Sequence, residues 1–417
     1  MTSAAGSTPE ASPLVARTVA VEDPGSLLAL LPRDGALAWV RRGDGIVGWG
    51  NAATLRPSGP DRFAKARAWW AEQAATAVVR DEVDSPGTGL VCFGSFAFAD
   101  DPGSSVLVVP EVVVGRRGAI TWVTTIGAGT IGAPPSVGHT DPPEPPAGVS
   151  FADGARSGTE WESVVAEAVR RIQAGGLEKV VLARDLLATA ESDIDLRWPL
   201  SRLSETYPMC WTFHVDGLFG ATPEMLVRRE RGLVTSRVLA GTIRRTGHDE
   251  RDLALAATLA RSSKDLEEHE YAVRSVADSL APHCTSMNVP ESPFVLHLPN
   301  VMHLATDVAG VAKDDATSLE LAEALHPSAA VGGTPTAKAT ALIGEIEGMD
   351  RGRYAGPVGW MDGAGDGEWG IALRSGEVDG RAVRLFAGCG IVASSDPAAE
   401  LAEAQAKFVP VRDAISS

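Results

Sequence analysis

The sequence predicts an α+β fold dominated by a large antiparallel or mixed sheet. Short apolar runs bounded by Gly, Pro and Asp outnumber the helical stretches, and they cluster without the strict strand–helix alternation of a doubly wound sheet. The chain has 417 residues, of which 44% are hydrophobic and 22% are charged, as in an ordinary soluble globular protein. This length allows two or three domains, although a mixed sheet-and-helix enzyme of this size can also form a single body.

Charge and cysteine content exclude several classes of partner and site. The chain has 37 Lys and Arg against 54 Asp and Glu, a net charge of −17, and it has no dense basic run. Nucleic acid and anionic membranes are therefore poor partners. No apolar run approaches the ~18 residues that span a bilayer. Four cysteines far apart, without a CxxC pair, indicate neither a disulfide framework nor a zinc site, so we expect a reducing, cytoplasmic setting.

The N-terminal third is expected to hold a loose tail followed by a strand-rich part of the same body. Residues 1–20 are expected to be a disordered tail, since the first segment is rich in Ala, Ser and Thr and has no secretory signal pattern. Residues 21–128 form the strand-rich part, and the Pro- and Gly-rich residues 129–150 predict a linker or long surface loop. The predicted strands are Leu27–Leu31, Ala36–Val40, Gly89–Phe98 and Ser105–Val114, and the predicted helix is Arg62–Val79.

Residues 151–417 have clearer helix signals. Thr159 followed by Glu162 fits a capping box, and a glycine pair ends that helix. A long helix is expected over Asp249–Ala281, with a break near Ser262, and a last helix has Asp396 as its N-cap and Pro397 at its first position. The other expected elements are a strand from Lys179, a short helix near Leu200, and strands at Trp211–Val215, Met225–Arg229, Leu233–Ala240, Gly356–Met361, Trp369–Arg374 and Val383–Gly388.

Two titratable residues stand beside apolar strands. Lys179 opens the strand KVVLAR, where desolvation can lower the proton affinity of a lysine enough to make it a base. Glu224 lies in the Gly- and Pro-containing turn GATPEML, where partial burial would keep a carboxyl group protonated and able to donate a proton. A solvated strand-end lysine and a solvated turn glutamate are the alternative interpretations.

Carboxylates on two helices form a candidate metal site. Glu268 lies beside the apolar stripe of the long helix, and Glu400 and Glu403 share one face of the last helix with Lys407. Carboxylates from two helices that meet over a cleft suit Mg²⁺, which prefers oxygen ligands. A salt-bridged surface face is the alternative interpretation.

Several residues are candidates for binding an anionic or ring-shaped ligand. Arg374 can hold a carboxylate through two parallel hydrogen bonds, and glycines allow backbone N–H groups to approach one. An isolated arginine can equally form a structural ion pair, and a histidine can be an ordinary hydrogen-bonded one. The candidates are Arg374, Lys407, Gly388, Gly390, His303 and His326.

These segments, in this order, resemble the chorismate-utilising enzymes, which include isochorismate synthase, salicylate synthase, anthranilate synthase component I and aminodeoxychorismate synthase component I. The resemblance covers roughly residue 159 to the C-terminus. It is carried by KVVLAR, GATPEML, LAGTIRR, KDLEEH, HLAT, LHPSAAVGGTP, GPVGW, GDGEWGIALR and GCGIVASSDPAAE. Each motif is weak alone, and their common order makes the resemblance specific.

The resemblance implies a role for each matching residue. The lysine of KVVLxR is the general base in isochorismate and salicylate synthases, which implies this role for Lys179, and the glutamate of the xPE turn is the general acid, here Glu224. Glu268 and Glu403 then correspond to Mg²⁺ ligands, with Glu400 close by. The implied substrate-binding residues are Gly241, Thr242, His303, Ala330, Val331, Tyr354, Leu373, Arg374, Gly388, Gly390 and Lys407.

Among these enzymes, the sequence most resembles isochorismate synthase, which isomerises chorismate to isochorismate. Relatives that use ammonia or an amine typically have Gln at the position of Lys179, and aminodeoxychorismate synthases often have Lys at that of Ala240. Ala330 followed by Val331 resembles isochorismate synthases, whereas Tyr354 and Leu373 also occur in salicylate synthases. Salicylate synthase therefore remains an alternative, and an inactive chorismate-binding subunit is the alternative of another class.

The resemblance also implies the architecture and the setting. It predicts a single α+β domain of the anthranilate synthase component I type, with two large, mostly antiparallel sheets packed together and helices outside. No helix has a sustained heptad seam, so a monomer or weak homodimer is expected. Chorismate is the implied substrate and Mg²⁺ the implied cofactor, and the product would serve menaquinone, catechol siderophore or salicylate synthesis.

Overall fold

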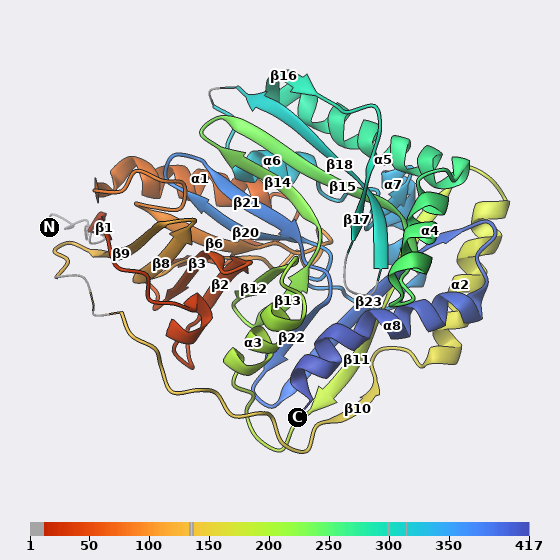
Figure 1. Ribbon diagram of the computed structural model, residues 1–417, viewed down its shortest axis with the longest axis horizontal. Helices are drawn as coiled ribbons and strands as arrows, with labels where there is room; N and C mark the ends of the chain where they lie inside the picture. The colour runs from red at the N-terminus through yellow and green to blue at the C-terminus, as the bar shows by residue number, and fades with distance from the viewer. Residues whose placement is uncertain (1–11, 133–134, 136, 298–300, 314, 417) are drawn as a thin grey trace, which may run out of the picture.

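Two large β-sheets form the frame of the molecule in the computed structural model, which describes residues 12–416 except 133–134, 136, 298–300 and 314 (Figure 1). The side chains of residues 264 and 268 also lie outside the described part. The first sheet has 13 strands and the second has 10. Among the described residues every strand pairing is antiparallel, except for one parallel pair at an edge of the first sheet.

The 13-stranded sheet combines strands from both ends of the chain. Its strand order is β10-β11-β23-β22-β13-β12-β2-β3-β8-β9-β1-β5, and β19 pairs with β11 beside this path. The strands are β1 (Leu14–Ala20), β2 (Leu37–Arg41), β3 (Asp44–Trp49), β5 (Val78–Asp81), β8 (Val112–Arg117), β9 (Ile120–Ala128), β10 (Ser150–Asp153), β11 (Lys179–Thr189), β12 (Trp211–Val215), β13 (Leu218–Thr222), β19 (Gly333–Thr334), β22 (Ser375–Asp379) and β23 (Ala382–Val392).

The 10-stranded sheet has the order β16-β18-β15-β14-β21-β20-β6-β7-β4, and β17 pairs with β18 beside this path. Its longest strands, β15 and β18, pair with each other along their whole length and carry a bulge between Ala240 and Thr242. The strands are β4 (Ala53–Leu55), β6 (Val91–Ser95), β7 (Val106–Val109), β14 (Met225–Glu230), β15 (Leu233–Arg244), β16 (Cys284–Asn288), β17 (Phe294–His297), β18 (Val301–Ala312), β20 (Pro357–Asp362) and β21 (Gly367–Ile371).

The helices lie around the two sheets (Figure 1). The α-helices are α1 (Arg62–Thr76), α2 (Gly158–Gln173), α3 (Arg197–Thr206), α4 (Asp249–Leu259), α5 (Ser263–Leu280), α6 (Ser318–Ala324), α7 (Thr336–Ile346) and α8 (Pro397–Ile415), and the 3-10 helices are η1 (Leu27–Leu30) and η2 (Ala281–His283). Helix α8 packs against β23, α2 and α3, and α5 packs against β15 and β18. The site described below lies close to α5 and α8.

Two apolar cores explain why the sheets and helices take these positions. The larger core joins residues of both sheets, among them Trp39 of β2, Phe93 of β6 and Trp369 of β21, none more than 1% exposed. A second core joins the 13-stranded sheet to α3 and α8, where Leu200 and Phe408 are buried. Strand β11 is buried along most of its length, and its two buried charges are paired, Arg184 with Asp153 and Asp185 with Arg384.

The predicted fold class is confirmed: the chain forms one α+β domain of two mostly antiparallel sheets with helices outside. Several element boundaries also agree with prediction. The long helical segment breaks between α4 and α5, where the side chain of Ser262 caps α5. Helix α8 begins as predicted, because the Asp396 carboxylate accepts a hydrogen bond of 2.9 Å from the backbone N–H of Ala399.

Other predictions about the N-terminal part were wrong. Residues 1–20 were expected to be a disordered tail, yet Leu14–Ala20 form β1, which pairs with β9 and β5 and in which buried side chains alternate with partly exposed ones. Residues 1–11 lie outside the described part. Leu27–Leu31 were expected to form a strand, but Leu27–Leu30 form η1, because buried leucines also fit a helical turn. The first helix ends at Thr76, and the β-branched pair Val78 and Val79 joins β5.

The capping box of α2 is displaced by two residues from the predicted position. Ser157 and not Thr159 is the N-cap, and its partner is Glu160 and not Glu162. Both residue pairs have the spacing of a capping box, so sequence alone did not separate them. Helices α6 and α7 and the long strand β18 were not predicted, since their apolar residues lack a clear period. Between Ala128 and Ser150, the described residues form neither helix nor strand.

Candidate active site

A cavity of about 490 Å³, here called the substrate cavity, lies where β11, β23, β15, β18 and α8 meet. Most of the residues singled out in the sequence line it: Glu224, Thr242, His303, Ala330, Val331, Tyr354, Leu373, Arg374, Gly388, Gly390, Glu403 and Lys407. Lys179, Gly241 and Glu400 lie beside lining residues and are described below. Glu268 belongs to α5, but its side chain, and with it the predicted ligand role, lies outside the described part.

Glu224 lies in the turn between β13 and β14, with its side chain partly buried. The backbone N–H of Glu224 donates a hydrogen bond of 3.2 Å to the Thr222 hydroxyl, which fixes the turn. Burial raises the pKa of the Glu224 carboxyl, and the cations of Arg374, Lys407 and Lys179 only partly oppose this rise. A carboxyl group with a raised pKa can hold a proton and deliver it to a leaving group.

Lys179 is the first residue of β11 and pairs with Val392 of β23 and Thr334 of β19. Its side chain extends over Gly390, where an added Cβ would lie 2.7 Å from the Lys179 Cε and 3.4 Å from its Nζ. Because Gly390 lines the substrate cavity, the ammonium group of Lys179 stands at the margin of that cavity. The positive charge of Lys179 also acts on Glu224, where it offsets a small part of the rise in pKa that burial causes. The candidate base and the candidate acid are therefore brought to the same cavity.

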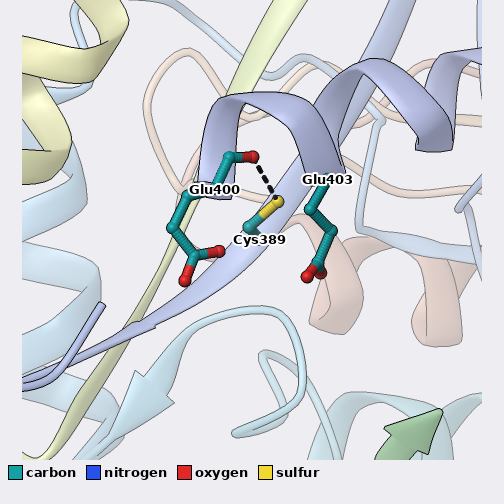
Figure 2. A group of neighbouring side chains, drawn as sticks. All are labelled: Cys389, Glu400 and Glu403. Atoms are coloured by element: carbon teal, nitrogen blue, oxygen red, sulfur yellow. Dashed lines mark hydrogen bonds between the residues drawn. The ribbon is translucent and has the colours of Figure 1, made fainter. Parts of the chain in front are cut away.

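Glu400 and Glu403 lie one turn apart on α8, and their carboxylates extend toward the same side, beside Cys389 of β23 (Figure 2). One carboxylate oxygen of each and the Cys389 Sγ lie within 4.8 Å of one another. Burial raises the pKa of Glu400, with the Glu403 charge adding to this effect. Burial also acts on Glu403, but Lys407, whose Nζ lies 2.7 Å from its Oε1, lowers the pKa of Glu403 overall.

The chemistry of this group fits a hard cation bound by the carboxylates and not by the thiol. Cys389 is a poor partner for Mg²⁺, because burial raises the pKa of its thiol to about 12 and the Sγ donates a hydrogen bond of 3.4 Å to the carbonyl oxygen of Glu400. Two oxygen-donor side chains on one helix face are the kind of ligands that Mg²⁺ uses while keeping several waters. The predicted positions of Glu400 and Glu403 are therefore compatible with a magnesium site.

The anion-binding candidates line one region of the substrate cavity. Arg374 has a φ of +49° in the turn between β21 and β22, and its side chain has no hydrogen bond or salt bridge to another residue in the described ranges. The Lys407 Nζ donates to the carbonyl oxygen of Gly388 over 2.9 Å. An arginine without a carboxylate partner at a cavity wall favours an anionic ligand over a structural ion pair.

His303 of β18 stands across the β-bulge from Thr242, with 2.9 Å between its Nδ1 and the Thr242 hydroxyl. Burial, followed by the nearby cations of Arg374 and Lys407, lowers the pKa of His303 to about 4. The ring is therefore neutral at pH 7 and acts through hydrogen bonds and not through charge. Gly241 forms the bulge with a φ of +76°, a conformation that favours glycine.

The apolar wall of the cavity includes Tyr354, which stacks on Phe386 of β23 with ring centroids 5.1 Å apart. Burial raises the pKa of the Tyr354 hydroxyl, so this group stays protonated. Val331 and Leu373 are also buried in this wall, whereas Ala330 is exposed. A flat aromatic ring and small aliphatic side chains suit a cyclic ligand of limited size.

Sequence analysis missed several lining residues. Arg244 lies two residues after Thr242 on β15, and the alternation of a strand places both on one face, so LAGTIRR contained this signal. Arg351 lines the cavity and donates to the carbonyl oxygens of Val181 (2.6 Å) and Val331 (3.0 Å). Tyr207 and Cys210 also line it, and no local pattern marks them.

His326, the other candidate histidine, does not line the substrate cavity. Its Nε2 donates to the carbonyl oxygen of Phe98 over 3.0 Å, and its ring packs against Phe63 and Phe98. Burial lowers its pKa to about 4, so it is neutral. This histidine is held by packing in the fold, as the alternative interpretation expected.

Within the described residues, no helix combines the length and the apolar character needed to cross a membrane.

Comparisons with known proteins agree with this geometry. A sequence model of the family described as chorismate binding enzyme matches residues 139–416. The chain is 40% identical over 261 residues to the isochorismate synthase DhbC of Bacillus subtilis, an alignment that covers 60% of this chain and 66% of the relative. It covers 55% of the length of the B. subtilis isochorismate synthase MenF, so the chain spans between about half and two thirds of these relatives.

Solved structures show the same fold over nearly the whole chain. A crystal structure from Bacillus anthracis, described as a 2,3-dihydroxybenzoate-specific isochorismate synthase, DhbC, matches with a TM-score of 0.76 and 31% identity, covering 93% of this chain and 98% of that one. Anthranilate synthase component I from Streptococcus pneumoniae matches with a TM-score of 0.73 at 20% identity, covering 89% of this chain and 92% of that one. The family match and the residues gathered at the substrate cavity lead to one conclusion: the chain belongs to the chorismate-binding enzymes.

Proposed function

We propose that the protein is an isochorismate synthase, which isomerises chorismate to isochorismate. The observation that carries this proposal is that Glu224 lines the substrate cavity, with its pKa raised by burial, while Lys179 extends over Gly390 at the margin of the same cavity. Exchange of a hydroxyl between two ring carbons needs a base for the incoming water and an acid for the departing hydroxyl. The names of the B. subtilis relatives support the same reaction.

Chorismate has two carboxylates, and the cavity has groups suited to each. The enolpyruvyl carboxylate is assigned to Arg374, whose guanidinium can bind it in a bidentate manner. The ring carboxylate is assigned to the region near Gly388 and Gly390, where backbone groups can approach closely. The neutral His303, held by Thr242, can donate or accept a hydrogen bond to the substrate without adding charge.

Glu403, with Glu400 beside it and Glu268 from α5, is the proposed ligand set for Mg²⁺. When bound, this ion would offset the repulsion between the protein carboxylates and those of the substrate and would help to orient the ring carboxylate. The Lys407 ammonium, 2.7 Å from Glu403, fixes the position of that carboxylate on α8. Activity is therefore expected to depend on a divalent cation.

The two catalytic side chains act on opposite ends of the rearranging bonds. Lys179, in its uncharged form, removes a proton from water as the oxygen forms a bond to ring carbon 2. The ring double bonds shift and the carbon–oxygen bond at carbon 4 breaks. Glu224 donates its proton to the departing hydroxyl, which leaves as water. One water enters and one leaves in each turnover, so chorismate and isochorismate remain isomers.

Incubation of the pure protein with chorismate and Mg²⁺, followed by chromatography, tests the proposed activity. We expect isochorismate to form until it reaches equilibrium with chorismate. Formation of salicylate with an equal amount of pyruvate would instead identify the protein as a salicylate synthase, the second candidate. The presence of Tyr354 and Leu373 in the cavity favours this second candidate. Tight chorismate binding without any product would assign an inactive chorismate-binding subunit.

We propose a cytoplasmic enzyme that works as a monomer or weak homodimer and whose product enters menaquinone or catechol siderophore synthesis. The presence of Lys179, Glu224, Glu268 and Glu403 together supports an active enzyme, because an inactive subunit has no chemical need of all four. Sedimentation equilibrium over a range of concentrations tests the oligomeric state. Loss of menaquinone or of the siderophore in a strain that lacks the protein would assign the pathway.

A further inference from the structure

A second cavity, of about 440 Å³, adjoins the substrate cavity and is here called the rear cavity. Glu224, Leu239 and Ala330 line both cavities, so they form the boundary between the two. The candidate general acid is therefore accessible from two sides. None of the groups assigned above to the substrate carboxylates lines the rear cavity.

The rear cavity lies between α5, strands β14 and β15, and the segment from the end of α6 into α7. Ser275 on α5 and Ala337 on α7 line it and are both exposed, so the cavity opens to solvent between these helices. Its hydroxyl-bearing residues come from every side of it: Ser236, Ser275, Ser279, Ser328, Thr336 and Thr340.

These hydroxyls are suited to holding water. The Ser328 hydroxyl is buried and has no hydrogen-bond partner among the described residues. A buried polar group without a protein partner is commonly satisfied by an ordered water. The volume is far above the minimum of about 10–15 Å³ that one water needs. The remaining wall is mainly aliphatic, with Leu226, Val276 and Ile371 among its members. Its one arginine, Arg237, already binds both carboxylate oxygens of Asp307, over 2.7 and 2.8 Å.

The proposed reaction creates a need for such a space. In each turnover Lys179 gains a proton and Glu224 loses one, and a water is released at Glu224 while the substrate ring occupies the substrate cavity. Before the next turnover, Glu224 must regain a proton and the released water must leave. A path through the substrate cavity is obstructed by the ring, whereas the rear cavity reaches Glu224 from the other side.

We propose that the rear cavity is the solvent route of the general acid: it receives the water released at Glu224 and returns a proton to the carboxylate. This inference rests on the proposed function. Ser328 and the hydroxyls of α5 and α7 hold the water chain, and the opening between Ser275 and Ala337 connects it to bulk solvent. The groups that line the rear cavity alone do not face the substrate, so they act on turnover and not on binding.

The test narrows the opening without altering the substrate cavity. Ala337→Phe places a large ring at the exposed opening, and Ala341→Phe is the matched control, since Ala341 is exposed on the same helix but does not line the cavity. We expect Ala337→Phe to lower kcat by about tenfold. A general acid contributes about 10²–10⁴-fold to the rate, and slower return of its proton would remove part of that contribution. KM and the Kd for chorismate should not change, and Ala341→Phe should behave as wild type.

An isotope experiment measures the exit of water directly. Chorismate labelled with ¹⁸O in its carbon-4 hydroxyl is incubated with the enzyme in unlabelled water until it approaches equilibrium with isochorismate. The fraction of ¹⁸O that remains in chorismate is then measured as a function of the amount of isochorismate formed. The wild type should lose label from chorismate quickly, because released water escapes before the reaction reverses. Ala337→Phe should retain label at equal conversion, because trapped water returns to carbon 4. Ser275→Phe, at the other side of the opening, should act in the same way.

The outcomes separate this proposal from the proposed function. A wild type that forms no isochorismate would contradict the function itself. An active wild type whose kcat and label loss are unchanged by both Ala337→Phe and Ser275→Phe would overturn the solvent route alone. A rise in KM with unchanged kcat would also overturn it, because the opening would then be the entrance for substrate.

Discussion

Lys179 depends for its position on a glycine on the neighbouring strand. A Cβ at Gly390 would lie 2.7 Å from the Lys179 Cε, closer than real side chains allow. Gly390→Ala should therefore displace the amine from the attacking water and lower kcat by up to about 10²-fold, because small misplacements of a catalytic group are costly. Circular dichroism and the thermal midpoint should remain near those of the wild type. Wild-type turnover would remove the assigned role of this contact.

The catalytic amine itself can be tested by truncation. Lys179→Ala removes the proposed base and should lower kcat by about 10²–10⁴-fold while chorismate still binds. Lys179 is the first residue of a strand that is buried along most of its length, so the fold should persist. Calorimetric titration with chorismate, next to a turnover assay, separates the two effects. Full turnover by this variant would contradict the base assignment.

Glu224 makes both activity and stability depend on pH. Its folded-state pKa is raised by burial, so any stability due to its protonated form is present at low pH and is lost as pH rises through the raised pKa. Activity, which needs the same proton, should fall over that pH range. Glu224→Gln should therefore be inactive yet melt at a higher temperature than wild type above that range. Measurement of kcat and of the thermal midpoint between pH 4 and about pH 9, a span that covers raised carboxyl pKa values, checks both signs.

The two α8 carboxylates make a prediction about metal removal. EDTA should abolish turnover and Mg²⁺ should restore it, because Glu403 and its neighbours would otherwise repel the anionic substrate. Glu403→Gln should weaken Mg²⁺ binding in calorimetric titration. Asp413→Asn, which removes an exposed carboxylate from the same helix, is the control and should bind Mg²⁺ as wild type does. A stripped enzyme with full activity would contradict the metal role.

At the scale of elements, α8 carries three charged residues of the site, Glu400, Glu403 and Lys407, and its start is capped by one side chain. The Asp396 carboxylate caps the helix through the N–H of Ala399. Asp396→Ala should cost about 0.5–2 kcal/mol of stability. Because Glu400 and Glu403 lie in the first two turns, fraying there should also weaken Mg²⁺ binding. Urea unfolding measures the first effect, and Asp396→Ser, which keeps a capping oxygen, should preserve both properties.

The break between α4 and α5 is another element that places the site. Ser262 begins α5 by accepting a hydrogen bond from the N–H of Asp265, and the helix then carries Glu268 and lines the rear cavity from Ala272 to Ser279. In a single unbroken helix from α4 through α5, the residues from Ala272 to Ser279 would not occupy these positions. The break near Ser262 was predicted from the sequence, whereas the packing of α5 against β15 and β18 was not.

At the scale of the whole molecule, Glu368 joins the two sheets. It lies on β21, and its carboxylate accepts hydrogen bonds from the indoles of Trp39 (2.8 Å) and Trp211 (3.2 Å) of the other sheet. Arg228 of β14 binds it over 2.6 Å. Burial alone would raise the pKa of Glu368, but Arg228 and the hydrogen bond from Trp39 lower it overall. One buried carboxylate thus satisfies polar groups from both sheets.

Removal of this charge should destabilise the whole domain. Glu368→Ala leaves Arg228 and two indoles without their partner, and we expect a cost of about 3–5 kcal/mol. Because the folded pKa of Glu368 is lowered, its stabilising effect is present above the unfolded pKa and is lost as pH falls through the folded one. Glu230→Ala, which removes a half-exposed partner of Arg117, should cost at most about 1 kcal/mol. Urea unfolding at pH 7 and at acid pH compares the two, and equal losses would contradict this role.

The sequence by itself determined the local features of the protein. The α+β class, the capped start of α8, the break near Ser262 and the order of the motifs all follow from residues close together in the chain. The sequence could not decide between two structures where one pattern fits both equally well. The Ser157 and Thr159 boxes have the same spacing, and an apolar run such as Leu27–Leu31 suits a buried turn as well as a strand.

Only the tertiary structure decided which distant residues meet. Lys179 lies over Gly390, Glu224 stands between two cavities, and Glu368 joins the sheets, although no local pattern marks these contacts. The physical reason is that strand pairing and burial depend on partners far away in the chain, while propensity and capping act within a few residues. Residue types therefore indicated the chemistry, and packing selected the geometry in which it can occur.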